Sequence, residues 1–234
     1  MIISEKRLLI NHNCKENMKN IPRIFIGNDL KSGIIIPASR EIAHYLTHVM
    51  RCRDAIVFGG GHEFNAKLDD SGKNIIVGDD TGRADPSGET ILYFAPIKRT
   101  DDLINMATQL GVKKIVPIIT EHTTAHHINW ERMKKIAIEA AEQSNRNSVP
   151  EISEPMKFSD LDLSGIAFAD ERAAYGETRP TTTKVKSVLI GPEGGFSYSE
   201  FAALDNAGAV GISLGKTILR AELAAAIALA RIDK

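Results

Sequence analysis

The chain is poor in cysteine, in charge of one sign and in long apolar runs. Among 234 residues it has only two cysteines, Cys14 and Cys52, which are too few for a disulfide framework and lack the CxxC spacing of a zinc site. We predict both as free thiols. The 29 basic and 30 acidic residues leave a net charge of −1, which excludes a global basic field for nucleic acid or acidic membranes. Any RNA site must therefore be local.

No stretch approaches the roughly 18 consecutive apolar residues of a membrane-spanning helix. Glu5, Lys6 and Arg7 also interrupt the beginning of the chain, where a signal peptide needs an apolar run. We therefore expect a cytoplasmic protein without a membrane partner. The composition that remains is that of a globular protein, with 43% hydrophobic and 25% charged residues.

The pattern of apolar residues changes along the chain and predicts three regions. Residues 1–20 are polar and lack sustained periodicity, as in a flexible extension. Residues 21–88 combine one helical pattern with short β-like runs, which describes a small β-barrel-like domain. The helical pattern covers residues 39–50, and the β-like runs are 23–26, 55–58, 63–68 and 74–77. Residues 79–89 form the richest turn cluster, and we place the domain boundary there.

In residues 89–234, strand-like and helix-like patterns alternate, which predicts an α/β domain with a parallel sheet and helices on its faces. The predicted strands are 90–94, 114–119, 165–169, 185–190 and 210–213, and the predicted helices are 101–110, 129–144, 197–207 and 221–231. Within helix 129–144, five apolar residues at helical spacing form a buried face, namely Met133, Ile136, Ala137, Ala140 and Ala141.

Three loops follow predicted strands, at the edge where open parallel sheets bind ligands. The first is Gly191-Pro192-Glu193-Gly194-Gly195, whose glycines allow close backbone approach to a ligand. The second covers residues 213–222, and the third is Asp170-Glu171-Arg172. Taken singly, each loop also fits an ordinary turn. Glu222 also fits a residue whose negative charge offsets the partial positive charge of a helix N-terminus.

Two other kinds of site are disfavoured. Residues 211–217 come close to a phosphate-binding P-loop but lack one intervening residue, which argues against a nucleotide triphosphatase. His44 and His48 fit one helix face, and three more histidines cluster at 122, 126 and 127. Because exposed or hydrogen-bonded histidines are far commoner than metal ligands, we predict no metal.

Six pieces of sequence form a pattern in chain order. They are Arg23-Ile-Phe, His44-Tyr-Leu with Val49-Met-Arg51, Leu110-Gly-Val112 with Pro117, Glu139-Ala-Ala-Glu-Gln143-Ser-Asn-Arg146 with Pro150, Ile190-Gly-Pro-Glu-Gly-Gly-Phe196 with Glu200, and Leu214-Gly with Ile218-Leu-Arg220-Ala-Glu222. The pattern resembles the RsmE-type ribosomal RNA uridine N3-methyltransferases of the SPOUT superfamily, from about Arg23 to the C-terminus.

This resemblance implies a PUA-like RNA-binding domain at residues 21–88 and a SPOUT methyltransferase domain with a deep trefoil knot at residues 89–234. It also implies S-adenosylmethionine as cofactor, small-subunit rRNA or the assembled small ribosomal subunit as partner, and a homodimer. The implied activity is methylation of N3 of a uridine in 16S rRNA. Two alternatives stay open, namely a non-catalytic RNA-binding or ribosome-assembly protein of the same fold, and a knotted methyltransferase for another RNA such as tRNA.

The resemblance also assigns roles to residues. The implied cofactor-binding residues are Ala169, Ile190, Gly191, Pro192, Glu193, Gly194, Gly195, Ser213, Leu214, Gly215, Ile218 and Leu219. The candidate catalytic residues are Arg220, Glu222 and Glu193, and the implied RNA-binding residues are Arg23, Arg51, Lys98, Gln143, Asn145 and Arg146. An arginine beside the uracil carbonyls would stabilise the developing N3 anion, while either glutamate would order the loop or accept a proton.

The chain departs from the family pattern at three positions in and directly after the second loop. Thr217 stands where the family usually has arginine, and Ala221 and Leu223 stand where it usually has threonine. These changes remove hydrogen-bond donors beside the implied cofactor site, and therefore bear on cofactor affinity and rate.

Overall fold

The computed structural model describes residues 21–85, 88–124 and 129–232. The predicted flexible extension, residues 1–20, lies outside the described residues. The chain divides into two compact units, Met1–Asp85 and Pro86–Lys234, and each is described by itself. Within the described residues, no helix is long and apolar enough to cross a membrane.

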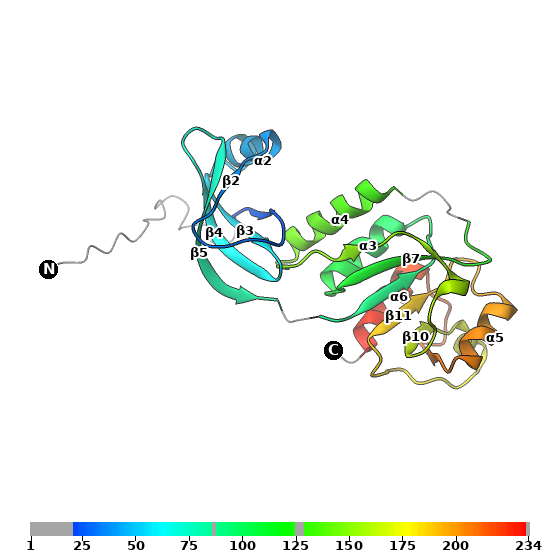
Figure 1. The fold of residues 1–234 in the computed structure, drawn as a ribbon. Helices are drawn as coiled ribbons and strands as arrows, with labels where there is room; N and C mark the ends of the chain where they lie inside the picture. Colours follow the sequence, from blue (N-terminus) through cyan, green and yellow to red (C-terminus); the bar gives the residue numbers. More distant parts are fainter. Residues whose placement is uncertain (1–20, 86–87, 125–128, 233–234) are drawn as a thin grey trace. The chain divides into compact units, whose positions relative to one another are not determined.

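The first unit is built on a curled five-stranded sheet with the strand order β1-β3-β4-β5-β2 (Figure 1). The strands are β1 (Arg23–Phe25), β2 (Ile35–Pro37), β3 (Asp54–Gly59), β4 (His62–Leu68) and β5 (Asn74–Ala84). β1 runs parallel to β3, and the other neighbours are antiparallel. Alternate apolar side chains such as Val57, Phe64 and Leu68 point into one core.

The predicted helix at 39–50 is present, but it changes its winding. It begins as α2 (Arg40–His44), with the Ser39 hydroxyl accepting the Ile42 backbone N–H at 3.2 Å, and continues as the wider π-turn η2 (Tyr45–Val49). Leu46 of η2 is completely buried in the core of this unit. The helix thereby covers the apolar face of the sheet.

Three features of the first unit differ from the prediction. β2 was not predicted, since three residues are too few to show a periodicity. β5 continues to Ala84, through residues predicted as a turn cluster, because pairing with β4 supplies backbone hydrogen bonds despite two register shifts. Cys52 is disulfide-bonded, so the prediction of a free thiol there is wrong. A low cysteine count excludes a framework of several bridges, but it does not exclude a single pair. Cys14 lies outside the described residues.

The second unit contains a sheet with all neighbours parallel and the order β12-β10-β11-β6-β7-β8. Its strands are β6 (Ile91–Phe94), β7 (Lys114–Ile119), β8 (Glu151–Ile152), β10 (Ile166–Ala169), β11 (Ser187–Ile190) and β12 (Val210–Ile212), while β9 (Met156–Lys157) pairs separately with β7. β8 and β9 were not predicted, since two residues are too few to show a periodicity.

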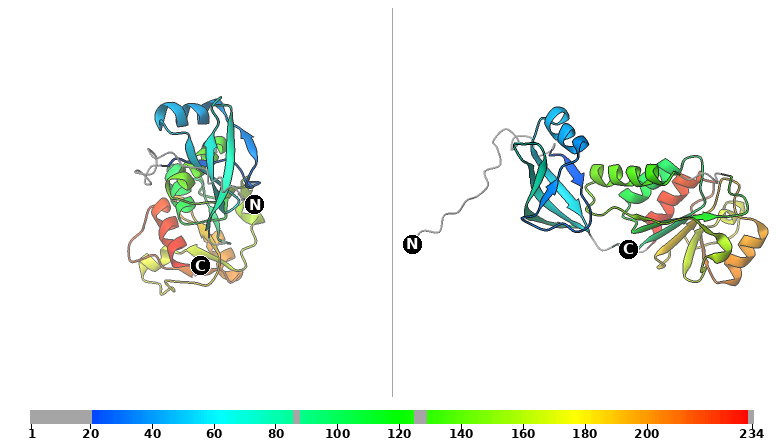
Figure 2. Two further views of the ribbon diagram at one scale, coloured as in Figure 1. Left: turned by 90° about the vertical axis from the view of Figure 1, so that its left-hand side faces the viewer. Right: turned by 45° about the horizontal axis from the view of Figure 1, so that its top comes forward.

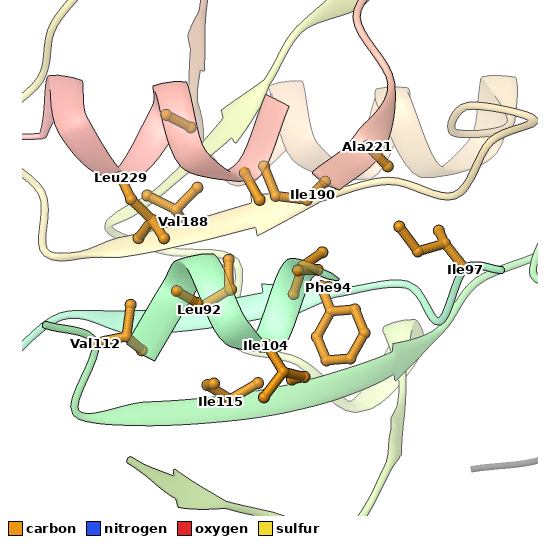
Figure 3. Close-up of a cluster of buried hydrophobic side chains, with 14 of the residues drawn as sticks. Leu92, Phe94, Ile97, Ile104, Val112, Ile115, Val188, Ile190, Ala221 and Leu229 are labelled. Carbon is orange, nitrogen blue, oxygen red and sulfur yellow. The ribbon is translucent and has the colours of Figure 1, made fainter. Parts of the chain in front are cut away.

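Helices cover both faces of this sheet. Three helices, α3 (Thr100–Gln109), α4 (Trp130–Gln143) and α6 (Ala221–Arg231), pack on one face (Figure 2). Their side chains meet strand residues such as Leu92, Phe94 and Val188 in one buried cluster (Figure 3). The alternate strand residues, among them Leu189, form a second cluster with α5 (Tyr198–Asn206). The predicted α/β layering is confirmed because each strand carries apolar residues on both faces.

The helix ends follow local sequence signals. Asn129 caps α4 by accepting the Arg132 backbone N–H at 3.0 Å, and Ser197 and Glu200 form a reciprocal capping box at the start of α5. On α4, Met133 and three alanines of the predicted face are buried and Ile136 is partly buried. Two short 3-10 turns, η3 (Phe158–Asp160) and η4 (Glu171–Tyr175), complete the unit.

Candidate functional site

A pocket of about 450 Å³ opens at the carboxyl ends of β6, β10, β11 and β12. Its walls are the three loops that the sequence singles out, together with the loop after β6. The lining residues are Lys98, Arg99, Ala169, Asp170, Glu171, Ala174, Ile190, Gly191, Pro192, Glu193, Gly195, Phe196, Leu214, Gly215, Thr217, Ile218, Leu219, Arg220, Ala221, Glu222 and Ala224. Loops distant in sequence meet here because parallel strands end at the same edge of the sheet.

Glycine geometry shapes the wall after β11. A Cβ atom on Gly191 would lie 3.1 Å from the ring of Phe196, so a larger residue would press on that ring. Gly195 has a φ of +71° and its backbone N–H donates to the Pro192 carbonyl at 3.0 Å, which closes a tight turn. A Cβ atom on Gly195 would likewise collide with the Glu171 carboxylate. The two glycines therefore leave room for the Phe196 and Glu171 side chains in the pocket wall.

Glu193 joins the loop after β11 to the loop after β6. Its Oε1 accepts the backbone N–H of Lys98 at 3.1 Å, although the glutamate side chain is exposed to solvent. The structure thus brings together Glu193, predicted as catalytic, and Lys98, predicted to bind RNA. Through this bond Glu193 orders the rim of the pocket.

Glu222 and Arg220 lie at the start of α6. The Glu222 side chain is buried, and its Oε1 is 3.8 Å from Nε of Arg99. Arg220 is exposed at the N-cap of α6, and no ion pair between its guanidinium and another described side chain occurs. Of the two candidate catalytic groups on this segment, only Arg220 therefore presents an uncommitted charge at the pocket.

Two predicted cofactor residues, Gly194 and Ser213, do not line the pocket, whereas the others do. A Cβ atom on Gly194 would lie 3.2 Å from that of His122. The Ser213 backbone N–H donates to the Pro180 carbonyl at 2.8 Å, and the Ser213 carbonyl accepts from Arg231 at 2.5 Å. Both residues thus shape the loops from behind.

The sequence missed several lining residues. Arg99 lies in the loop after β6. The preference of ligands for the carboxyl ends of parallel strands, which identified the other loops, would also have identified this one. Asp170 and Glu171 lie in a loop that the sequence singled out without assigning them a role. Among the departures from the family pattern, Thr217 and Ala221 line the pocket and Leu223 does not.

The candidate RNA-binding residues differ in their surroundings. Arg51, Gln143 and Asn145 are exposed, and Asn145 adopts a positive φ of 57°, which asparagine tolerates. The Arg146 guanidinium donates to the Ser148 hydroxyl at 3.1 Å and lies against the backbone of Gly111, where a Cβ atom would come within 2.6 Å of it.

Arg23 lies in the interior of the first unit. Its side chain is only 11% exposed, it forms an ion pair with Glu63 at 2.5 Å, and its guanidinium lies over the Phe58 ring. An arginine held in this way is poorly placed to contact RNA. The sequence could not reveal this, because Glu63 is on a different strand.

The described part of the chain contains no group of three or more histidine, cysteine, aspartate or glutamate side chains that could hold a metal. The His44 and His48 rings stack with centroids 4.6 Å apart. His126 and His127 lie outside the described residues.

Fold and site together define an α/β protein with a pocket of small-molecule size at the carboxyl edge of a parallel sheet. The family model described as an RNA methyltransferase domain matches residues 84–233. The chain belongs to the RNA methyltransferase family, among the relatives of ribosomal RNA small subunit methyltransferase E. The predicted family and enzyme class are therefore confirmed.

Individual relatives cover nearly the whole chain. Ribosomal RNA small subunit methyltransferase E of Rickettsia conorii is 34% identical over 90% of this chain and 94% of its own length. The protein of that name from Buchnera aphidicola subsp. Acyrthosiphon pisum is 31% identical over 90% and 92%. A solved structure of the Neisseria gonorrhoeae protein, bound to S-adenosyl methionine, superposes with a TM-score of 0.75 at 25% identity, over 90% of this chain and 96% of that one.

Proposed function

We propose that this protein transfers a methyl group from S-adenosylmethionine to N3 of a uridine in the 16S RNA of the small ribosomal subunit. The observation that carries the proposal is the pocket at the carboxyl edge of the sheet, lined by the loops that resemble the family's cofactor loops. The relatives named as small-subunit ribosomal RNA methyltransferases support the choice of RNA.

The pocket fits this cofactor in size and chemistry. Its volume of about 450 Å³ lies within the range of small-molecule sites. Ile190, Leu214 and Leu219 offer apolar walls for an adenine, and the backbone at Gly191 to Gly195 offers hydrogen-bonding groups for a neutral ribose. Charges of both signs at the rim suit a zwitterionic methionine.

The bound cofactor supplies a sulfonium methyl group that is already a strong electrophile. The chain's own residues must therefore hold the uracil in line and favour loss of the N3 proton to solvent. We assign the second task to Arg220, whose exposed guanidinium stabilises negative charge on the uracil. Glu222, buried beside Arg99, and Glu193, bonded to the Lys98 backbone, are assigned the ordering of the pocket loops.

The proposal extends to the RNA and to the organisation of the chain. Residues 21–88 act as a PUA-like RNA-binding domain and residues 89–234 as a knotted SPOUT methyltransferase domain. Arg51, Lys98, Gln143 and Asn145 are exposed, which supports their role in contacting RNA. The protein acts in the cytoplasm as a homodimer. Sedimentation equilibrium measures its oligomeric state.

The test combines binding with product analysis. Calorimetric titration of S-adenosylmethionine is compared with methylation of small ribosomal subunits that lack the modification, and mass spectrometry identifies the methylated base. We expect N3-methyluridine from the wild-type protein. Arg220→Ala should lower kcat by about 100-fold or more and leave the cofactor Kd within about twofold.

Two further variants control this test. Leu214→Arg places a charge in an apolar wall of the pocket and should abolish cofactor binding. Lys135→Ala, on the exposed side of α4, should match the wild-type protein. Cofactor binding without methyl transfer would favour the non-catalytic alternative, methylated tRNA would favour the other RNA substrate, and no cofactor binding would overturn the proposal.

A further inference from the structure

A buried ion cluster at the carboxyl end of β10 has no part in the proposed chemistry. At its centre is Asp170, whose side chain is fully buried. Its Oδ1 accepts from the Arg172 backbone N–H at 3.1 Å and from Arg172 Nε at 2.9 Å. Its Oδ2 accepts from Arg172 Nη2 at 2.8 Å and from Arg179 Nε at 2.6 Å. Burial acts to raise the pKa of Asp170, but the bonds from Arg172 and Arg179 outweigh it and lower the pKa below its ordinary value.

Arg172 connects this carboxylate to α5. Its Nη1 and Nη2 donate to the two carboxylate oxygens of Asp205 at 2.8 and 2.9 Å, in a bidentate pair. Its guanidinium also lies 4.5 Å from the centre of the Phe201 ring. The cluster therefore joins a strand end to a helix on the second face of the sheet.

Arg179 connects the same carboxylate to the second pocket loop. It bonds Asp170 and Glu177, and the next residue, Pro180, accepts the Ser213 backbone N–H through its carbonyl at 2.8 Å. Ser213 is where the pocket loop of residues 213–220 begins. A shift of Arg179 would therefore move Pro180, and with it the hydrogen bond that holds the start of this loop.

Asp170 also contacts the strand that leads into this loop. Its backbone N–H donates to the Ile212 carbonyl at 3.1 Å. A Cβ atom on Gly211 would lie 2.5 Å from Oδ2 of Asp170, so only glycine leaves room for the carboxylate at that point of β12. The cluster thereby holds the loop of residues 213–220 from two sides.

We propose that Asp170 and Arg179 are positioning residues, which fix the loop of residues 213–220 and thereby set the affinity of the pocket for S-adenosylmethionine. The inference rests on the proposed function for the identity of the ligand. The loop supplies Leu214, Gly215 and Ile218 to the pocket, while the cluster's own segment supplies Ala169, Asp170 and Glu171. Because the ion cluster joins these two segments, a shift of either one would displace both walls of the pocket.

The experiment uses the full chain and variants of Arg179, whose side chain is 25% exposed and which is therefore milder to change than Asp170. Arg179→Met removes the charge at similar length, and Arg179→Lys retains it. Arg132→Met is the matched control, since Arg132 forms an ion pair with Asp101 at 2.5 Å on the surface between α4 and α3.

Loss of the charged hydrogen bond in Arg179→Met should raise the cofactor Kd and KM about tenfold. kcat at saturating cofactor should stay within about twofold of the wild-type value, because Arg179 itself does not line the pocket. In Arg179→Lys, the increase in log Kd should be at most half of the increase in Arg179→Met. In the ligand-free protein, hydrogen exchange of residues 213–220 should accelerate in Arg179→Met and stay unchanged in Arg132→Met.

A Kd for Arg179→Met within twofold of the wild-type value, or unchanged exchange of the loop, would overturn the inference. An equal loss of affinity in Arg132→Met would also overturn it, since the effect would then be one of general stability. If the wild-type protein binds no S-adenosylmethionine, the proposed function fails, and the exchange of residues 213–220 still decides whether the cluster orders this loop.

Discussion

At the scale of single residues, Glu63 is a charged group buried among the described residues of the first unit. Its carboxylate accepts from Arg23 at 2.5 Å, from Arg83 at 2.8 Å and from Thr81 at 2.9 Å. Burial acts to raise the pKa of Glu63, but the bonds from Arg83, Arg23 and Thr81 lower it from 4.5 to about 2. Arg23 is accordingly a structural residue that neutralises a buried carboxylate.

The low pKa of Glu63 predicts a specific pH dependence. Because its folded-state pKa lies below the unfolded one, its contribution to stability is complete above about pH 4.5 and is lost as the pH falls toward 2. Glu63→Gln should lower the free energy of unfolding by about 3 kcal/mol at pH 7, and this difference should shrink steadily as the pH falls toward 3.

Urea unfolding followed by circular dichroism at several pH values measures the difference. Glu131→Gln is the control, since the exposed ion pair of Glu131 with Lys134 should contribute only about 0.3 kcal/mol to the free energy of unfolding. A loss in Glu63→Gln that is the same at pH 7 and pH 3 would contradict the assignment.

At the scale of elements, α5 starts immediately after the pocket loop and is held by its first turn. The Ser197 hydroxyl accepts the Glu200 backbone N–H at 3.3 Å, and Glu200 Oε2 accepts the Ser197 backbone N–H at 2.9 Å. The second oxygen of Glu200 accepts the backbone N–H of Glu121, after β7, at 2.8 Å. One carboxylate thus completes a helix cap and fixes a neighbouring loop.

This arrangement predicts unequal effects of two substitutions in one cap. Ser197→Ala should lower the free energy of unfolding by about 1 kcal/mol, the usual loss for an N-cap, as should Asn129→Ala at the start of α4. Glu200→Ala should cost about 2 kcal/mol or more, because it leaves the buried backbone N–H of Ser197 and the partly buried one of Glu121 without their acceptor. Urea unfolding compares the three variants, and equal losses in Ser197→Ala and Glu200→Ala would disprove the double role.

At the scale of the whole molecule, the net charge of −1 limits how the protein can bind RNA. The exposed cations among the candidate site residues are Arg51, Lys98 and Arg220. With three or four phosphate contacts, log K should fall with log salt concentration at a slope of about −2 to −4. A filter-binding titration of small-subunit RNA at several salt concentrations measures the slope, and a value near −10 would show a much larger basic surface.

Much of the fold and part of the site were accessible to sequence reasoning. Helices α3, α4 and α5 were predicted to within one residue at each end, because helical periodicity depends on neighbouring residues. The loops at 191–195 and 213–222 lie at the carboxyl edge of the sheet, as predicted, since they follow strands of a parallel sheet, and most of their residues line the pocket.

Other features depend on contacts between residues distant in sequence. The extension of β5 to Ala84 requires its partner β4, and the burial of Arg23 requires Glu63 of another strand. Arg99 beside Glu222, and Asp170 between Arg172 and Arg179, likewise come together only when the strands are ordered in the sheet.

The sequence by itself thus determined the class of fold, the family and the loops that form the pocket, because local patterns carry that information. The tertiary structure alone decided which charged side chains are exposed at the pocket and which form ion pairs inside the protein. The physical reason is that a buried charge must find a partner, and the partner is chosen by packing rather than by position along the chain.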